Sequence, residues 1–329
     1  MINDIDKWSR RGFLKQAVVG SGSIAPILNR SSRLEGGVSR DQRKDVQVCV
    51  FSKHLQWLGY EDMGEAAAEL GFDGVALTVR PGGHVLPERA QDDLPKAVEA
   101  VSRAGIQIPM LTTKIADARD VNSETILRLA AKFGIHHYRM GYYSYDDAVD
   151  IRSRLDQIKP KVKELADLNR SFGVFGGYQN HAGEQYVGAP VWDVWELIRD
   201  LDPKWIGCQF DIRHATVDGA TAWPVSFRLV APYTRMLAIK DFRWKKSNGT
   251  WQTENCPLGE GVVNFPKFIK LLKAHKFRGP ISIHYEYPLG GANHGATKLE
   301  MDRKEFFAAL KSDLDTLRVW LKAGGLLSE

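Results

Sequence analysis

The sequence predicts an α/β protein of the (β/α)8 TIM barrel class. After residue 45, eight short β-rich runs alternate with eight segments of helical periodicity, which is the pattern of a parallel sheet. Eight such units favour a closed barrel over any other parallel sheet. An open doubly wound sheet is the alternative, but no GxGxxG motif follows the first strand, which counts against dinucleotide binding.

The expected strands are short runs in which alternate residues face the barrel interior or the helices. In chain order they are 46–51 (VQVCVF), 74–79 (GVALTV), 106–111 (IQIPML), 136–140 (HHYRM), 173–179 (GVFGGYQ), 206–211 (IGCQFD), 235–240 (RMLAIK) and 281–286 (ISIHYE). Helical patterns lie between and after them, at 61–70, 91–104, 123–133, 146–172, 190–200, 221–231, 264–276 and 302–323. The segment 242–260 follows the seventh strand and is long enough to form a lid or a short hairpin.

Residues 1–44 are expected to precede the barrel domain, which we place at 45–329. SRRGFLK at 9–15 is followed by a weakly apolar stretch at 16–28, an arrangement typical of a twin-arginine export signal. The alternative is a disordered basic tail. Residues 29–44 are rich in Ser, Gly and Arg, as in a linker. The signal predicts a periplasmic or otherwise exported protein.

The basic character of the chain belongs to its first segment. The chain has 45 Lys and Arg residues against 40 Asp and Glu, and residues 1–44 hold nine of the basic and four of the acidic ones. The remaining 36 of each leave the barrel domain with no net charge, so no nucleic-acid partner is expected. No apolar run is long enough to predict a membrane span, and three cysteines without CxxC spacing predict no disulfide framework.

Polar residues gather on the inner face of four predicted strands. The alternation of each strand places its apolar residues toward the helices and its polar residues toward the interior. The inner positions are Gln179 and His181, Gln209 and Asp211, Ala238 and Lys240, and His284 and Glu286. Most of them are polar and stand near the carboxyl ends of the strands, where the active sites of this fold class lie. Since burying unpaired charges is costly, this clustering indicates an active site.

Four segments carry a family resemblance. They are GGYQNHAGEQYVG at 176–188, CQFDIRHA at 208–215, LAIKDF at 237–242 and ISIHYEYP at 281–288. In this order they resemble the sugar phosphate isomerase/epimerase family of the xylose isomerase-like TIM barrel superfamily, and the resemblance covers about 45–325. It implies an isomerase or epimerase with a small-molecule carbohydrate substrate, in a family where homo-oligomers are common.

The resemblance also implies a divalent metal, commonly held in that family by four side chains at the ends of strands five to eight. The strand-six Asp corresponds to Asp211, followed by His214, and the strand-eight Glu corresponds to Glu286. The strand-five Glu position holds Gln179, and the strand-seven His position holds Ala238, so two of the four ligands are changed. The implied site for Mn²⁺, Mg²⁺ or Zn²⁺ is therefore Gln179, Asp211, His214 and Glu286.

Lys240 offers an alternative to the metal, because its ammonium would lie between Asp211 and Glu286 and replace the cation. Either carboxylate has the chemistry of a general base, and an ammonium polarises a substrate oxygen. His181 is suited to proton transfer. The predicted catalytic residues are therefore Glu286, Asp211, Lys240 and His181, each weighed against a structural ion pair or a hydrogen-bonded core histidine.

Substrate contacts are predicted around the same end of the barrel. Arg80 follows the second strand and is suited to bind a carboxylate or phosphate, while Arg139 faces inward on the fourth strand, where a buried guanidinium needs an anion nearby. The full set of predicted substrate-binding residues is Arg80, His84, Arg139, His284 and Tyr178.

These residues predict an exported sugar isomerase or epimerase that abstracts a proton next to a carbonyl, with possible assistance from a metal. Two alternatives stay open. The same enediolate chemistry can expel a leaving group, giving a lyase or hydrolase of keto-glycosides. A barrel that has lost its metal ligands can also be a sugar-binding protein without catalysis.

Overall fold

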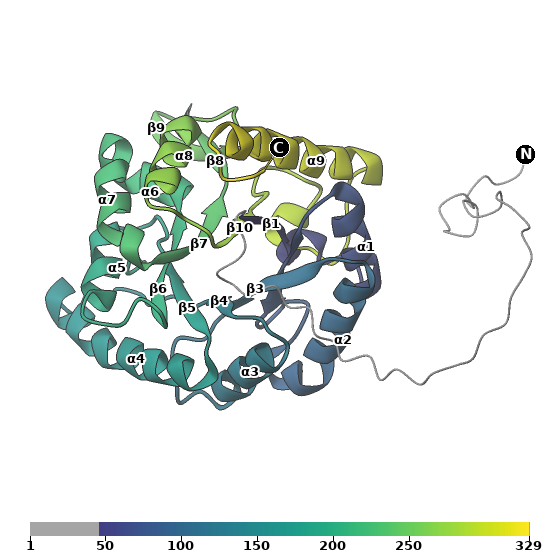
Figure 1. The fold of residues 1–329 in the computed structure, drawn as a ribbon. Helices are drawn as coiled ribbons and strands as arrows, with labels where there is room; N and C mark the ends of the chain where they lie inside the picture. Colours follow the sequence, from purple (N-terminus) through teal and green to yellow (C-terminus); the bar gives the residue numbers. More distant parts are fainter. Residues whose placement is uncertain (1–45, 329) are drawn as a thin grey trace, which may run out of the picture. The chain divides into compact units, whose positions relative to one another are not determined.

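The computed structural model describes residues 46–328, which form a closed barrel of eight parallel strands (Figure 1). The strands pair in the order β1-β10-β7-β6-β5-β4-β3-β2. Their bounds are β1 Gln47–Phe51, β2 Gly74–Val79, β3 Gln107–Thr113, β4 His137–Arg139, β5 Phe175–Gln179, β6 Ile206–Asp211, β7 Thr234–Ile239 and β10 Pro280–Ile283. The prediction of a (β/α)8 TIM barrel is confirmed. The predicted twin-arginine signal and linker at 1–44 lie outside the described residues.

Helices surround the barrel as the connections between its strands (Figure 1). They are α1 Tyr60–Leu70, α2 Ala90–Arg103, α3 Val121–Lys132, α4 Ile151–Phe172, α5 Val191–Ile198, α6 Ile212–Gly219, α7 Trp223–Val230, α8 Phe265–Ala274 and α9 Arg303–Ala323. Short 3-10 helices, among them Ser52–Leu55 and Ala292–His294, lie in the connecting loops. No helix within 46–328 combines the length and the apolar character needed to cross a membrane.

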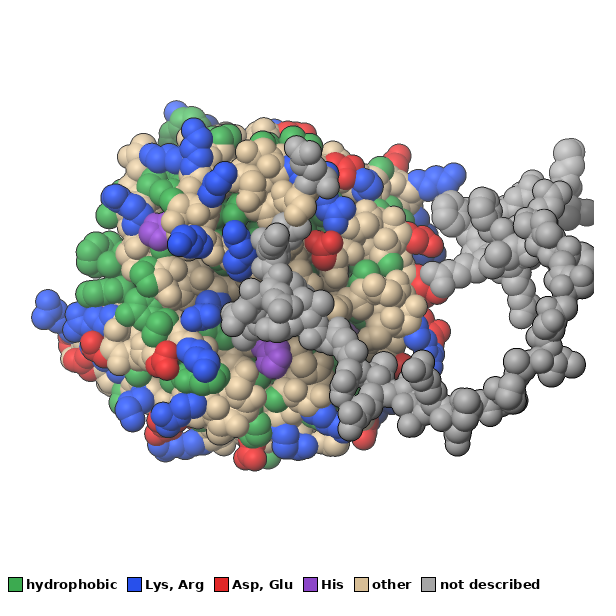
Figure 2. All heavy atoms as spheres, viewed as in Figure 1, with side chains coloured by type: hydrophobic (Ala, Val, Ile, Leu, Met, Phe, Trp, Pro, Cys, Tyr) green, Lys and Arg blue, Asp and Glu red, His purple; other side chains and the backbone are tan. Residues whose placement is uncertain are grey.

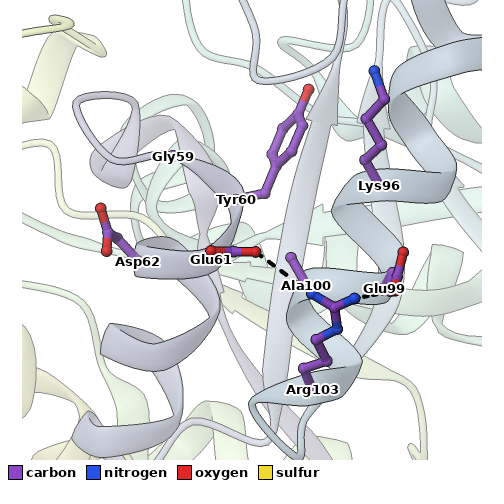
Figure 3. Close-up of a pocket in the computed structure, with 8 residues that line it drawn as sticks. All are labelled: Gly59, Tyr60, Glu61, Asp62, Lys96, Glu99, Ala100 and Arg103. Atoms are coloured by element: carbon purple, nitrogen blue, oxygen red, sulfur yellow. Dashed lines mark hydrogen bonds and ion pairs between the residues drawn. The ribbon is translucent and has the colours of Figure 1, made fainter. Parts of the chain in front are cut away.

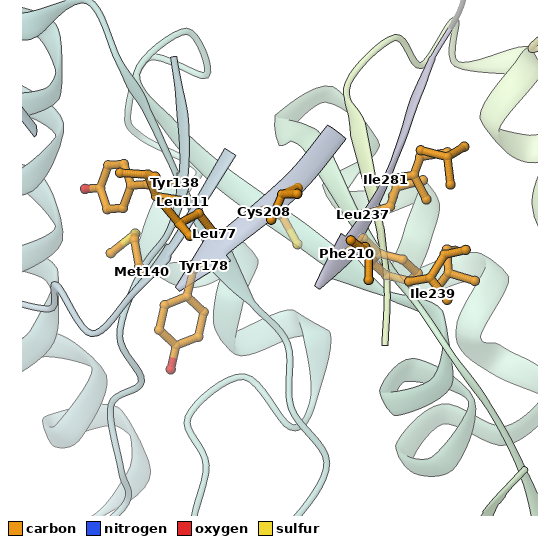
Figure 4. Packing of buried hydrophobic residues seen from close by; sticks show 14 of the residues in the cluster. Leu77, Leu111, Tyr138, Met140, Tyr178, Cys208, Phe210, Leu237, Ile239 and Ile281 are labelled. Atoms are coloured by element: carbon orange, nitrogen blue, oxygen red, sulfur yellow. The ribbon is translucent and has the colours of Figure 1, made fainter. Parts of the chain in front are cut away.

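The core has two layers, as the alternation of the strands predicts. Outward-facing residues such as Leu77, Cys208, Phe210 and Leu237 pack against the helices in one large cluster (Figure 4). The inward-facing residues form a small separate cluster that fills the barrel interior. They are Cys49, Ala76, Met110, Phe175 and Met236. The predicted inward and outward sides of strands five to eight are therefore confirmed by the packing.

The structure differs from the expected elements in several places. The last strand, expected at 281–286, ends at Ile283, so His284 and Glu286 lie directly after it. Helix α4 begins at Ile151 and not at 146, because the Asp150 carboxylate accepts hydrogen bonds from the main-chain N–H groups of Arg152 and Ser153 and caps the helix there. A further helix, α6, starts directly after β6, where a loop was expected. The Asp211 carboxylate caps it in the same way, through the N–H of His214.

A two-stranded hairpin, β8 Asp241–Ser247 and β9 Thr250–Cys256, follows β7 and lies outside the barrel sheet. This confirms the hairpin expected within 242–260. On the face shown in Figure 2, Lys and Arg side chains are scattered with Asp and Glu among them and do not form one continuous basic patch.

Candidate active site

Three charged side chains meet at the carboxyl end of the barrel. The Lys240 ammonium, directly after β7, lies 3.3 Å from the Oδ2 atom of Asp211 and 3.0 Å from the Oε2 atom of Glu286. Lys240 and Asp211 are buried, whereas the Glu286 side chain is 24% exposed. The lysine thus bridges two carboxylates that come from β6 and from the segment after β10.

A second ammonium reaches the more exposed carboxylate. Lys53, after β1, lies 3.2 Å from the Oε1 atom of Glu286. Burial alone would raise the pKa of Glu286, but the ammonium groups of Lys240 and Lys53 hold it well below its usual range. Burial raises the pKa of Asp211 despite Lys240, and the pKa of Lys240 is raised because the two carboxylates outweigh its burial. The two carboxyl groups therefore have different proton affinities.

Asp211 is fixed in place by its neighbours. The Asn180 side chain accepts a hydrogen bond from the Asp211 N–H at 2.8 Å and donates one to the Asp211 carbonyl oxygen at 3.0 Å. The Gln179 amide donates to the carboxylate at 2.8 Å, and the His214 N–H donates to it at 3.1 Å. With its main chain and both carboxylate oxygens held, Asp211 is a rigid part of the site.

The amide orientation of Gln179 bears on the predicted metal. Its Oε1 atom accepts hydrogen bonds from the Tyr142 hydroxyl at 2.6 Å and from the Arg139 guanidinium at 3.2 Å. Both neighbours are donors, so this oxygen faces them and the amide nitrogen faces Asp211. The oxygens of Gln179 and Asp211 are therefore not aimed at a common point where a cation would sit.

The donor set does not fit a divalent cation. Ala238 brings no ligand, and Lys240 and Lys53 already bind the carboxylates that a metal would need. Within 46–328 no group of three or more His, Cys, Asp or Glu side chains is arranged to hold a metal ion. The structure thus corresponds to the alternative in which the Lys240 ammonium lies between the two carboxylates.

Two neighbouring imidazoles lie beside the carboxylates. The rings of His181 and His214 are 4.0 Å apart, and the Nε2 atom of His214 is 3.6 Å from the Oδ2 atom of Asp211. The Nδ1 atom of His181 lies 2.9 Å from the Ala182 carbonyl oxygen, which requires the proton on Nδ1 and leaves Nε2 as an acceptor. Burial lowers the pKa of His181 to about 4, with a further contribution from Lys240, so the ring is neutral at pH 7.

The third predicted imidazole, His284, lies on the other side of Glu286. Its ring stacks on Phe51 with centroids 4.4 Å apart, and its Nδ1 atom is 4.0 Å from the Oε1 atom of Glu286. Burial and the neighbouring ammonium groups hold the pKa of His284 well below its usual range. The nearby His54 has a structural role, because its ring nitrogens bind the Ala292 carbonyl oxygen and the Tyr285 N–H.

Two of the predicted substrate residues lie outside this cluster. Tyr178 points out of the barrel into the layer beneath the helices (Figure 4), where its hydroxyl donates to the Val187 carbonyl oxygen and accepts from the Tyr143 N–H. This position gives no support to the predicted contact between Tyr178 and the substrate. The Nε2 atom of His84 is 3.1 Å from the Leu55 carbonyl oxygen, and burial lowers the pKa of this histidine to about 4. Both side chains stabilise loops near the site.

Tyr142 is a functional candidate that the strand pattern alone does not reveal. It follows β4, its hydroxyl binds Gln179, and the Arg139 guanidinium lies over its ring at 5.0 Å. Only the sequence YRMGYY, with an inward arginine followed by aromatic residues, signals it.

A surface groove between α1 and α2 lies on the outside of the barrel (Figure 3). Arg103 of α2 binds Glu61 of α1 across the groove and Glu99 on its own helix. It contains none of the predicted site residues.

The fold and the site together define the class of protein, a (β/α)8 barrel with titratable side chains gathered at the carboxyl ends of its strands, where enzymes of this fold carry their active sites. The family model for the xylose isomerase-like TIM barrel matches residues 65–306. The chain belongs to this family.

One curated relative and two solved structures give the context. An uncharacterized protein of Methanocaldococcus jannaschii is 28% identical over 131 residues, which are 39% of this chain and only 43% of that protein. D-psicose 3-epimerase from Clostridium cellulolyticum H10 is 14% identical, with 84% of this chain and 99% of that chain covered at a TM-score of 0.64. A xylose isomerase-like TIM barrel protein from Mycobacterium smegmatis in complex with magnesium is 18% identical, with 84% and 100% covered at 0.58. At these identities the two structures show a shared fold.

Proposed function

We propose that this protein is a sugar isomerase or epimerase that removes a proton from the carbon next to a carbonyl group. The observation that carries the proposal is the bridge of Asp211, Lys240 and Glu286 at the carboxyl end of the barrel. The sugar 3-epimerases among the structures of the same fold support the reaction class. Export through the leader at 1–44 is part of the proposal and rests on the sequence alone.

In this proposal Glu286 is the general base. It is the more exposed of the two carboxylates, and its lowered pKa keeps it ionised at neutral pH. It takes the proton from the carbon, while the Lys240 ammonium donates a hydrogen bond to the oxygen on which negative charge develops. Asp211 holds Lys240 in position. The unprotonated Nε2 of His181 accepts a hydrogen bond from a substrate hydroxyl.

A proton returns in one of two ways. Return from Glu286 to the neighbouring carbon, with transfer of the hydroxyl proton to the former carbonyl oxygen, gives an isomer. An epimer forms when solvent water protonates the opposite face of the same carbon, and Glu286 then releases its proton to solvent. No metal is required in this scheme, because the ammonium supplies the positive charge at the substrate oxygen. The donor set around Gln179 and Ala238 supports this version over a metal-assisted one.

Substitution of the proposed base tests the function. Glu286→Gln keeps the size of the side chain and removes the base, so turnover is expected to fall by roughly 10²–10⁴-fold. The matched control is Glu99→Gln on α2, outside the barrel, which is expected to keep full turnover. Near-ultraviolet circular dichroism checks that both variants keep the native packing. Undiminished turnover in Glu286→Gln would overturn the assignment.

A further inference from the structure

Three basic side chains stand at the ends of three consecutive barrel strands. Arg80 directly follows β2, Lys114 directly follows β3, and Arg139 is the last residue of β4. In the closed strand order β2, β3 and β4 are neighbours, and β3 lies diametrically across the barrel from β7, which leads into Lys240. We call Arg80, Lys114 and Arg139 the basic arc.

The basic arc has no carboxylate partner among the described residues. The ion pairs within 46–328 include neither Arg80, Lys114 nor Arg139. The Arg80 guanidinium lies 5.5 Å from the centroid of the Phe51 ring and makes no hydrogen bond to another described side chain. By contrast, Lys240, across the barrel, and Lys53, which follows β1 next to β2, both bind Glu286.

Arg139 is the buried member of the arc. It is only 6% exposed, and its polar contacts are to neutral acceptors, namely the Tyr142 hydroxyl, the Gln179 side-chain oxygen and the Thr113 carbonyl oxygen. Its Nε atom has no partner. Arg80 is partly buried, and its pKa is lowered to about 10 by burial and by the positive charge of Arg139. Two guanidinium groups that repel each other at a barrel mouth favour the binding of an anion, and no carboxylate within 46–328 pairs with either of them.

We infer that the basic arc binds an anionic oxygen group, a carboxylate or a phosphate, on the end of the substrate remote from its carbonyl. This inference rests on the proposed function, because it takes the reacting carbonyl to lie at Lys240, across the barrel from the arc. The substrate class is then an acyclic polyhydroxylated carbonyl compound with an acidic terminus, either a sugar acid or a sugar phosphate. Arginine suits both groups through its planar set of donors.

Ligands without an aldehyde or ketone group test the inference separately from turnover. D-Glucitol, D-gluconate and D-glucitol 6-phosphate share a polyol chain and differ in the terminal group, and none of them can undergo the proposed reaction. Calorimetric titration measures their affinities for the wild-type protein, for Arg80→Gln and for the control Arg128→Gln on the outer surface of α3. Inorganic phosphate serves as a competitor for the anionic ligands.

The expected result is that gluconate or glucitol 6-phosphate binds at least about 10-fold more tightly than glucitol, and that phosphate competes. The tighter binder of the two anionic ligands shows whether the substrate is a sugar acid or a sugar phosphate. Arg80→Gln is expected to reduce the preference to less than about 3-fold, and Arg128→Gln to leave it intact. Raising the salt from 50 to 300 mM weakens only the anionic ligands.

Two results would overturn the inference. One is glucitol binding as tightly as both anionic ligands, and the other is an anion preference that survives in a correctly folded Arg80→Gln variant. Lys114→Gln provides a second test at an exposed position where folding is not at risk. If the anion preference is found but no proton is abstracted from any carbonyl substrate, the proposed function fails and the basic arc stands.

Discussion

Lys240 is a buried cation whose positive charge is balanced on both sides, by Asp211 and by Glu286. Taking each of these charges out of water is costly, and partners at close range offset that cost. Removal of the ammonium would leave two carboxylates facing each other. The balance of positive and negative charge within this small cluster, more than the strength of any one contact, explains how the buried Lys240 is tolerated in the barrel.

The variant Lys240→Met is therefore expected to lower the free energy of unfolding by roughly 3–5 kcal/mol at pH 8. The loss is expected to be smaller at pH 5, because carboxylates without their ammonium partner bind protons more readily. Urea denaturation at both pH values measures the change. Lys245→Met, in an exposed ion pair of the hairpin, is the control and should cost less than about 1 kcal/mol. An equal loss at both pH values would contradict the account.

Asp313 on α9 is a second buried carboxyl, distant in sequence from the site. It accepts a hydrogen bond from the Leu258 N–H at 3.1 Å and one from the Tyr287 hydroxyl at 3.2 Å. Burial raises its pKa to about 7. The folded state therefore binds this proton more tightly than the unfolded state, and the contribution of Asp313 to stability is lost as the pH rises from about 4 to 7.

The variant Asp313→Asn removes this titration. Relative to the wild type, it is expected to gain stability as the pH rises from 5 to 8, with a slope of at most about 1.4 kcal/mol per pH unit. Urea denaturation of both proteins across this range measures the difference. His84 and His181 change stability in the opposite direction, since their lowered pKa values favour folding at higher pH, but both proteins contain them. A difference that does not vary with pH would contradict the assignment.

At the scale of elements, the loop after the β8–β9 hairpin depends on one carboxylate. Asp241 accepts hydrogen bonds from the main-chain N–H groups of Phe242, Gly259, Gly261 and Val263. Gly261 has no room for a side chain, because a Cβ atom there would lie 2.1 Å from the Asp241 Oδ1 atom. The loop that leads into α8 is thus folded around this carboxylate.

The variant Asp241→Ala is expected to lower the free energy of unfolding by roughly 3 kcal/mol, because several N–H groups lose their acceptor. Hydrogen exchange of the amides of Gly259 and Gly261 should become faster than in the wild type. Asp200→Ala, at an exposed position, is the control and should change neither quantity. Unchanged exchange at both glycines would show that Asp241 does not hold the loop.

The strands and helices were largely predictable from the sequence. The alternation of 206–211 places Asp211 inward and Phe210 outward, and the packing agrees. The same rule places Tyr178 outward, between the inward Gly177 and Gln179, so its prediction as a substrate contact departed from the pattern. Capping residues were harder to recognise, since Asp150 and Asp211 each set a helix start through contacts that periodicity does not reveal.

At the scale of the whole molecule, the barrel explains why distant segments meet in one site. Residues 53, 211, 240 and 286 belong to four separate strand ends, and closure of the sheet brings them together. The sequence predicts which strand end carries each side chain. It also predicts, as one of two alternatives, that Lys240 lies between Asp211 and Glu286. It does not predict the Lys53 contact with Glu286 or the amide orientation of Gln179, because both depend on rotamers set by three-dimensional neighbours.

The central claim is that Glu286 and the Lys240 ammonium remove a proton next to a carbonyl without a metal. The most direct measurement is deuterium incorporation from D₂O, followed by NMR, with a panel of aldoses, ketoses and their acid and phosphate derivatives. The account predicts that deuterium enters at the carbon next to the carbonyl, at the same rate before and after EDTA treatment, and that Glu286→Gln abolishes the exchange. Absence of exchange with every compound, or exchange that EDTA abolishes and Mn²⁺ restores, would contradict it.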